Sequence, residues 1–103
     1  ETLKGMIEDF LEKANVQPQK DIMGIVCPHA GYPYSGQTAA YSFKAISGGE
    51  YNTIILIGPS HHAFFDGISV YDKGEWKTPL GTISVDASLC KEIESYNPEV
   101  IKY

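Results

Sequence analysis

Two short apolar runs, each followed by a proline and then a histidine, constrain the fold of this chain more than any other feature. Residues 22–26 end shortly before His29, and residues 53–57 end shortly before His61 and His62. An apolar run of about 4 to 8 residues is typical of a strand covered on both faces, as in parallel sheets. A helical pattern separates the two runs, so the order predicts a βαβ unit with a right-handed crossover.

The remaining elements complete an α/β pattern. Residues 3–14 carry apolar side chains at helical spacing, and Ser35 is placed to cap a second helix over residues 36–46. Residues 67–72 and 82–86 alternate between apolar and polar, and residues 75–81 between them resemble an extended segment with a turn, which predicts a small β-excursion such as a hairpin. A last helix begins at Asp86 or Ser88 and ends near residue 96. We therefore expect a mostly parallel sheet flanked by helices, with residues 31–34 in a loop.

Length and charge limit the class of protein. A chain of 103 residues forms one domain at most, and its net charge of −5 argues against nucleic acid or an anionic membrane as a partner. No run approaches the roughly 18 apolar residues of a membrane span. With two cysteines, reduced thiols and a cytoplasmic location are expected. Because the sequence starts at Glu1 and stops just after the apolar pair Val100-Ile101, we expect residues 1–103 to be a single, incomplete domain.

The histidines are the candidate site residues. If the two predicted strands are parallel neighbours, His29 and His61 emerge side by side at the carboxyl edge of the sheet, where open α/β folds bind their ligands. Imidazole is a preferred ligand of iron, zinc, copper and nickel. An isolated histidine is more often an ordinary loop residue, but the three here are confined to two equivalent strand ends. We assign His61 to the metal and His62 to proton transfer or support of the ligands, although the sequence barely separates the two.

A third ligand is not evident. Cys27 precedes His29 by two residues and is expected to be buried as a small apolar group, and Cys90 has no metal-type spacing around it. Three aspartates are explained equally well by turns or a helix cap: Asp66, Asp72 and Asp86.

Other residues near the histidines leave two interpretations open. Ser35 could help to hold an anion at the helix start, but simple capping is favoured. Tyr32 and Tyr34 could line a pocket or merely cover the sheet edge. Gly31 and Gly58 could allow close backbone approach or simply mark loops.

Three motifs, in this order and at these separations, resemble the Memo family, the relatives of the mediator of ErbB2-driven cell motility. They are residues 28–32 (PHAGY), 58–62 (GPSHH) and 78–81 (TPLG). The resemblance covers most of the chain from about residue 21 to residue 86. It implies a Memo-like α/β domain similar to that of class III extradiol dioxygenases, which are non-haem iron enzymes.

The resemblance also implies a metal site. His29 and His61 match two of the family's ligands of a mononuclear iron or copper ion. The third family ligand is a cysteine, and it lies in the C-terminal part of the family's sequence, which corresponds to residues beyond Tyr103. A dioxygenase-like activity would place a small aromatic substrate, a catecholate, and oxygen at iron, with His62 moving a proton. Because fold-level analogy alone supports this chemistry, whether the chain belongs to an enzyme stays open.

A second function from another class uses the same residues. In this alternative, the pocket is a non-catalytic groove for a peptide or phosphopeptide. Its recognition groups are then the two histidines and two aromatic side chains: His29, His61, Tyr32 and Trp76.

Overall fold

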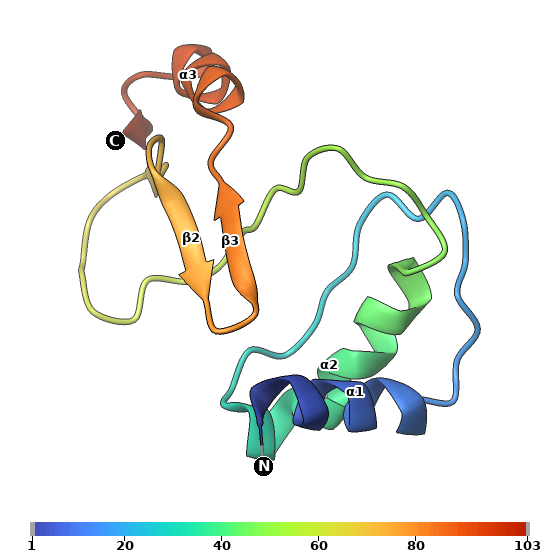
Figure 1. Ribbon diagram of the computed structural model, residues 1–103. Coiled ribbons are helices and arrows are strands. Elements are labelled where there is room, and N and C mark those ends of the chain that lie inside the picture. The colour runs from blue at the N-terminus through green and yellow to red at the C-terminus, as the bar shows by residue number, and fades with distance from the viewer. Residues whose placement is uncertain (1, 103) are drawn as a thin grey trace. The chain divides into compact units, whose positions relative to one another are not determined.

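The computed structural model describes residues 2–102, and the chain divides into two compact units, Glu1–Asn52 and Thr53–Tyr103. Figure 1 shows the order of the elements along the chain. The first unit holds α1 (Leu3–Lys13) and α2 (Tyr32–Ile46). The second holds, in order, β1 (Ile68–Ser69), β2 (Glu75–Thr78), β3 (Gly81–Ser84), α3 (Ala87–Tyr96) and β4 (Ile101–Lys102). The fold is mixed α/β, in the form of a small partial domain.

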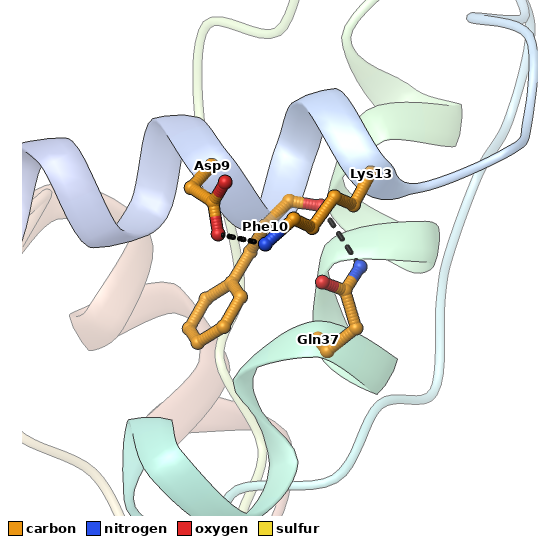
Figure 2. A network of polar contacts seen from close by, with 4 residues as sticks. All are labelled: Asp9, Phe10, Lys13 and Gln37. Atoms are coloured by element: carbon orange, nitrogen blue, oxygen red, sulfur yellow. Dashed lines mark hydrogen bonds and ion pairs between the residues drawn. The ribbon is translucent and has the colours of Figure 1, made fainter.

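Helix α1 confirms the first predicted helix. Thr2 is its N-cap, and the Thr2 hydroxyl accepts a hydrogen bond from the Gly5 N–H at 3.2 Å. The helix ends at Lys13, one residue earlier than expected, with Ala14 as its C-cap. On its exposed face, the ammonium of Lys13 lies 2.7 Å from the Asp9 carboxylate one turn earlier (Figure 2). An ion pair of this kind stabilises a helix by only about 0.3 to 0.5 kcal/mol, so the stability of α1 depends mainly on packing.

That packing is against α2. The ring of Phe10 lies over Gly36, where an added Cβ would come 2.5 Å from a ring carbon. Helix α2 also supplies hydrogen bonds to the carboxyl end of α1: the Gln37 side-chain amide donates to the Phe10 carbonyl at 2.9 Å (Figure 2), and the Lys44 ammonium donates to the Ala14 carbonyl at 2.8 Å. Each of these carbonyls also accepts a backbone N–H, from Ala14 and Val16 respectively, so the α2 side chains bond the second lone pair of each oxygen. The positive charge of Lys44 near the end of α1 also favours the helix dipole. The two helices therefore form one packed pair.

Helix α2 begins four residues before the predicted start. Gly31 is its N-cap, and Pro33 lies in the first turn. Of residues 31–34, expected in a loop, Gly31 lies outside the helix, but the expectation was wrong for residues 32–34. A proline in the first helical turn is tolerated, because the N–H that it lacks would have no partner there. The cap assigned to Ser35 was also wrong: its hydroxyl donates to the Ala30 carbonyl at 3.0 Å.

The two apolar runs do not form strands in the described part of the chain. Their side chains are largely exposed, with Met23 at 102% and Ile57 at 95%. The expectation of two buried parallel strands is therefore not met. A strand needs a neighbour that bonds its backbone, and apolar patterning does not identify that neighbour. Within the first unit, side chains bond two carbonyls of residues 22–26 instead: the Tyr51 hydroxyl donates to the Ile22 carbonyl at 3.0 Å, and the Ser42 hydroxyl to the Val26 carbonyl at 3.4 Å.

The predicted β-excursion is confirmed as an antiparallel hairpin of β2 and β3. Trp76 pairs with Ile83, and Thr78 pairs with Gly81 across a two-residue turn. The Thr78 hydroxyl stabilises this turn, because it accepts from the Leu80 N–H at 3.1 Å and donates to the Gly81 carbonyl at 3.3 Å. A separate parallel pair joins β1 to β4, with Ile68 opposite Ile101.

The N-cap of α3 is Asp86, one of the two caps that the sequence left open. The Asp86 carboxylate accepts a hydrogen bond from the Leu89 N–H at 3.0 Å. We expect Asp86→Ala to lower the free energy of unfolding by about 1 kcal/mol, while Asp86→Asn, which can cap equally well, changes it little. Urea denaturation followed by circular dichroism measures both. Equal losses for the two variants would contradict the capping role.

None of the described helices combines the length and apolar content that crossing a membrane requires.

Candidate functional site

His29 lies in the first unit, in the segment that leads into α2. It is exposed and stands two residues before the N-cap Gly31. Hydroxyl groups of α2 bond the backbone on both sides of it: Ser42 bonds the Val26 carbonyl and Ser35 bonds the Ala30 carbonyl. The position of the His29 backbone is therefore set by α2 and not by a sheet.

His61 and His62 lie in the second unit, in an exposed loop. The preceding Ser60 forms a local turn, since its hydroxyl donates to the Ala63 carbonyl at 2.7 Å and accepts from the Ala63 N–H at 3.2 Å. The two imidazole rings are edge to face, with centroids 6.5 Å apart and planes at 64°. Adjacent rings in this arrangement are not stacked, which is compatible with different roles for the two histidines.

The donor chemistry of the histidines fits iron or copper, but they do not complete a metal site. Among residues 2–102, no group of three or more His, Cys, Asp or Glu side chains could hold a metal ion. His29 belongs to one unit and His61 to the other, so their shared role as ligands stays a prediction. That the third donor lies beyond Tyr103, as the resemblance to the Memo family implies, likewise stays a prediction.

One of the two cysteines differs from what the sequence indicated. Cys27 is partly exposed and not buried, while both cysteines are free thiols in the structure. In α3, the Cys90 thiol donates to the Tyr71 carbonyl at 3.5 Å. Desolvation by burial raises the pKa of Cys90, and nearby carboxylates raise it further: Asp72, Asp86 and Glu94. A raised pKa disfavours the thiolate form of Cys90, which is the form that binds metals.

Two carboxylates beside Cys90 were not anticipated. Asp72 Oδ1 and Glu94 Oε1 are buried without a hydrogen-bond partner among the described residues. Asp72 had been explained as a solvated turn residue, and its burial has no local signal in the sequence. Glu94 lies four residues after Cys90, on the same face of α3. This spacing is the one sequence signal that could have placed the Glu94 carboxylate near Cys90.

The aromatic candidates lie on the surface. Tyr32 and Tyr34 form the first turn of α2 and are 48% and 88% exposed. Trp76 is 58% exposed and contacts Tyr71 edge to face, with ring centroids 5.9 Å apart. A polar hollow of about 420 Å³ in the first unit involves none of the predicted site residues; it is lined by Lys20, Asp21, Gly48, Gly49, Glu50 and Tyr51.

The model of the family described as "Memo-like protein" matches residues 1–102. The chain belongs to the Memo family. It is 42% identical over 95 residues to a MEMO1 family protein of Pyrococcus abyssi, a match that covers 90% of this chain and 33% of that protein. The match to the MEMO1 family protein of Pyrococcus furiosus is 43% over 94 residues, covering 90% and 31%. That of Nitrosopumilus maritimus is 42% identical over 78 residues, covering 76% and 28%.

The resemblance inferred from the three motifs is thus confirmed as Memo-family membership. The chain spans about a third of the length of the curated relatives it matches. No solved structure matches it. The likeness to extradiol dioxygenases therefore stays an expectation.

Proposed function

We propose that this Memo-family chain supplies His29 and His61 as two ligands of a mononuclear iron or copper ion, with the third ligand outside these 103 residues. One observation carries the proposal. All three histidines of the chain fall within two of the three motifs, residues 28–32 and 58–62, each directly after an apolar run. Two imidazole ligands leave coordination positions open for a third donor and a substrate.

The chemistry that such a site allows is redox chemistry. Bound iron or copper would supply an electron-transfer and oxygen-binding centre, and a small aromatic molecule is the proposed substrate by analogy with extradiol dioxygenases. His62 is proposed to move a proton, because its ring lies beside that of His61, with centroids 6.5 Å apart. The low number of cysteines, two in 103 residues, supports the proposed cytoplasmic location.

A second candidate function is recognition of a peptide or phosphopeptide without catalysis. The exposure of Tyr32 and Trp76 favours it, because exposed aromatic rings are common anchors of binding surfaces. Metal analysis separates the two candidates. Full-length protein purified from cells grown with iron and copper should contain about one metal ion per chain if His29 and His61 are ligands. Metal-free protein that still binds peptide would favour the second candidate.

We expect the isolated 103-residue chain to bind iron weakly. Two imidazoles without a third protein donor hold a metal poorly, and binding would also have to organise both ligands. Titration of the chain with iron(II) under anaerobic conditions, followed by calorimetry, measures the affinity, and the full-length protein serves as the control. Tight binding of one iron per 103-residue chain would contradict the placement of the third ligand outside it.

A further inference from the structure

Two serines on one face of α2 hold the segment that carries His29. Ser35 and Ser42 are seven residues apart, which is two helical turns, so they lie on the same face. Their hydroxyls donate to the carbonyls of Ala30 at 3.0 Å and Val26 at 3.4 Å. These carbonyls lie one residue after His29 and three residues before it. The shorter bond, that of Ser35, is the stronger of the two.

The bond of Ser35 is not needed to build the helix. Ser35 is the fourth residue of α2, and its backbone N–H already donates to the carbonyl of the N-cap Gly31 at 3.1 Å. The Tyr34 N–H donates to the same carbonyl at 2.9 Å. The Ser35 hydroxyl reaches past this cap to Ala30, which lies outside the helix. The bond therefore adds a constraint on the His29 segment and leaves the helical bonding unchanged.

Helix α2 is a firm support for this constraint. Its residue Ala40 is buried at 5% exposure, and α2 also bonds the carboxyl end of α1 through Gln37 and Lys44. By contrast, the segment with His29 is exposed and has no strand pairing among the described residues. Without the hydroxyl bond, the peptide next to His29 would lose a hydrogen bond to the helix pair.

We infer that Ser35 is a positioning residue for His29: by fixing the Ala30 carbonyl, it presets the backbone from which the imidazole reaches the metal. This inference rests on the proposed function of His29 as a ligand. Partners that orient metal ligands change the affinity for the metal by about 10- to 100-fold when they are removed. Ser35 acts through the backbone and not on the ring, so we expect the lower end of that range.

Two variants of equal shape test the role of Ser35. Ser35→Thr keeps a hydroxyl and Ser35→Val removes it, while both introduce a β-branched side chain of similar size into the helix. In the full-length protein, we expect Ser35→Val to weaken copper(II) binding about tenfold relative to Ser35→Thr. Ser47→Ala is the matched control, because the Ser47 hydroxyl bonds the Lys44 carbonyl at 2.6 Å at the other end of α2. It should leave the affinity unchanged.

A second readout does not need the metal. In the metal-free protein, ¹⁵N relaxation should give backbone order parameters near 0.85 for His29 and Ala30 in the wild type and in Ser35→Thr, falling toward 0.6 in Ser35→Val. Equal order parameters and equal copper affinities in the two Ser35 variants would overturn the inference. This holds even if both variants are less stable than the wild type.

Copper binding by His29→Ala, compared with that of the two Ser35 variants, separates this inference from the proposed function. If His29→Ala leaves copper binding unchanged, His29 is not a ligand, and the proposed function and the positioning role fail together. If His29→Ala abolishes binding while Ser35→Val binds copper as tightly as Ser35→Thr, the proposed function stands and the role of Ser35 fails.

Discussion

Replacing His29 or His61 by alanine is expected to remove the metal from the full-length protein. Each change would delete one of the two imidazole donors that this chain is proposed to contribute. The loss of affinity should exceed the 10- to 100-fold that follows from removing a mere supporting partner of a ligand. Metal content per chain, measured by inductively coupled plasma mass spectrometry after purification and dialysis, should fall from about one to near zero in both variants.

His62→Ala is the matched control for this experiment. It removes a neighbouring imidazole from the same exposed loop but not a proposed ligand, so the metal should stay bound. If His61→Ala retains the metal and His62→Ala loses it, His62 is the ligand and His61 is not. Retention by His29→Ala and His61→Ala alike would exclude both as ligands.

The largest expected effect on stability comes from Gly67→Ala. Gly67 has φ +101°, which L side chains rarely adopt, and an added Cβ would lie on the carbonyl oxygen of Val100. That oxygen accepts the hydrogen bond from the Ile68 N–H at 2.7 Å, next to the pairing of β1 with β4. Backbone strain of about 1 to 3 kcal/mol adds to a similar cost of overpacking. We therefore expect the free energy of unfolding to fall by about 3 kcal/mol, measured by urea denaturation.

Gly74→Ala separates strain from steric conflict. Gly74 also has a positive φ, of +81°, but its added Cβ would meet only the Tyr71 hydroxyl, at an ordinary 3.4 Å. We expect a loss of about 1 kcal/mol from the left-handed backbone alone. If the free energy of unfolding falls equally in both variants, the close approach of Gly67 to Val100 adds nothing to the cost of an alanine at position 67.

Local signals in the sequence predicted the elements that local interactions stabilise. The apolar spacing of residues 3–14 located α1, and Asp86 located the start of α3 because its carboxylate caps the helix directly. The extended segment that contains Trp76, its turn, and the alternation around Ile83 likewise indicated the hairpin. Helix α2 was found, but its start was displaced, since Pro33 is compatible with both a loop and a first helical turn.

Elements that need distant partners could not be located in the same way. The runs 22–26 and 53–57 have the composition of buried strands, yet the pairing that would make them strands is not encoded in the runs themselves. The same limit applies to the site. The motifs single out His29 and His61 as candidate ligands, while the proposed third donor is expected outside residues 1–103. The hydroxyl bond of Ser35 to Ala30 was missed because it skips over the N-cap.

The central claim is that one metal ion binds both His29 and His61. Pulsed electron paramagnetic resonance of the copper(II)-loaded, full-length protein counts the coordinated imidazoles directly through their remote nitrogens. The wild type should show two, and His29→Ala and His61→Ala should each show one at saturating copper, with His62→Ala unchanged at two. A wild-type spectrum with no imidazole coupling, or with a coupling that neither substitution alters, would contradict the claim.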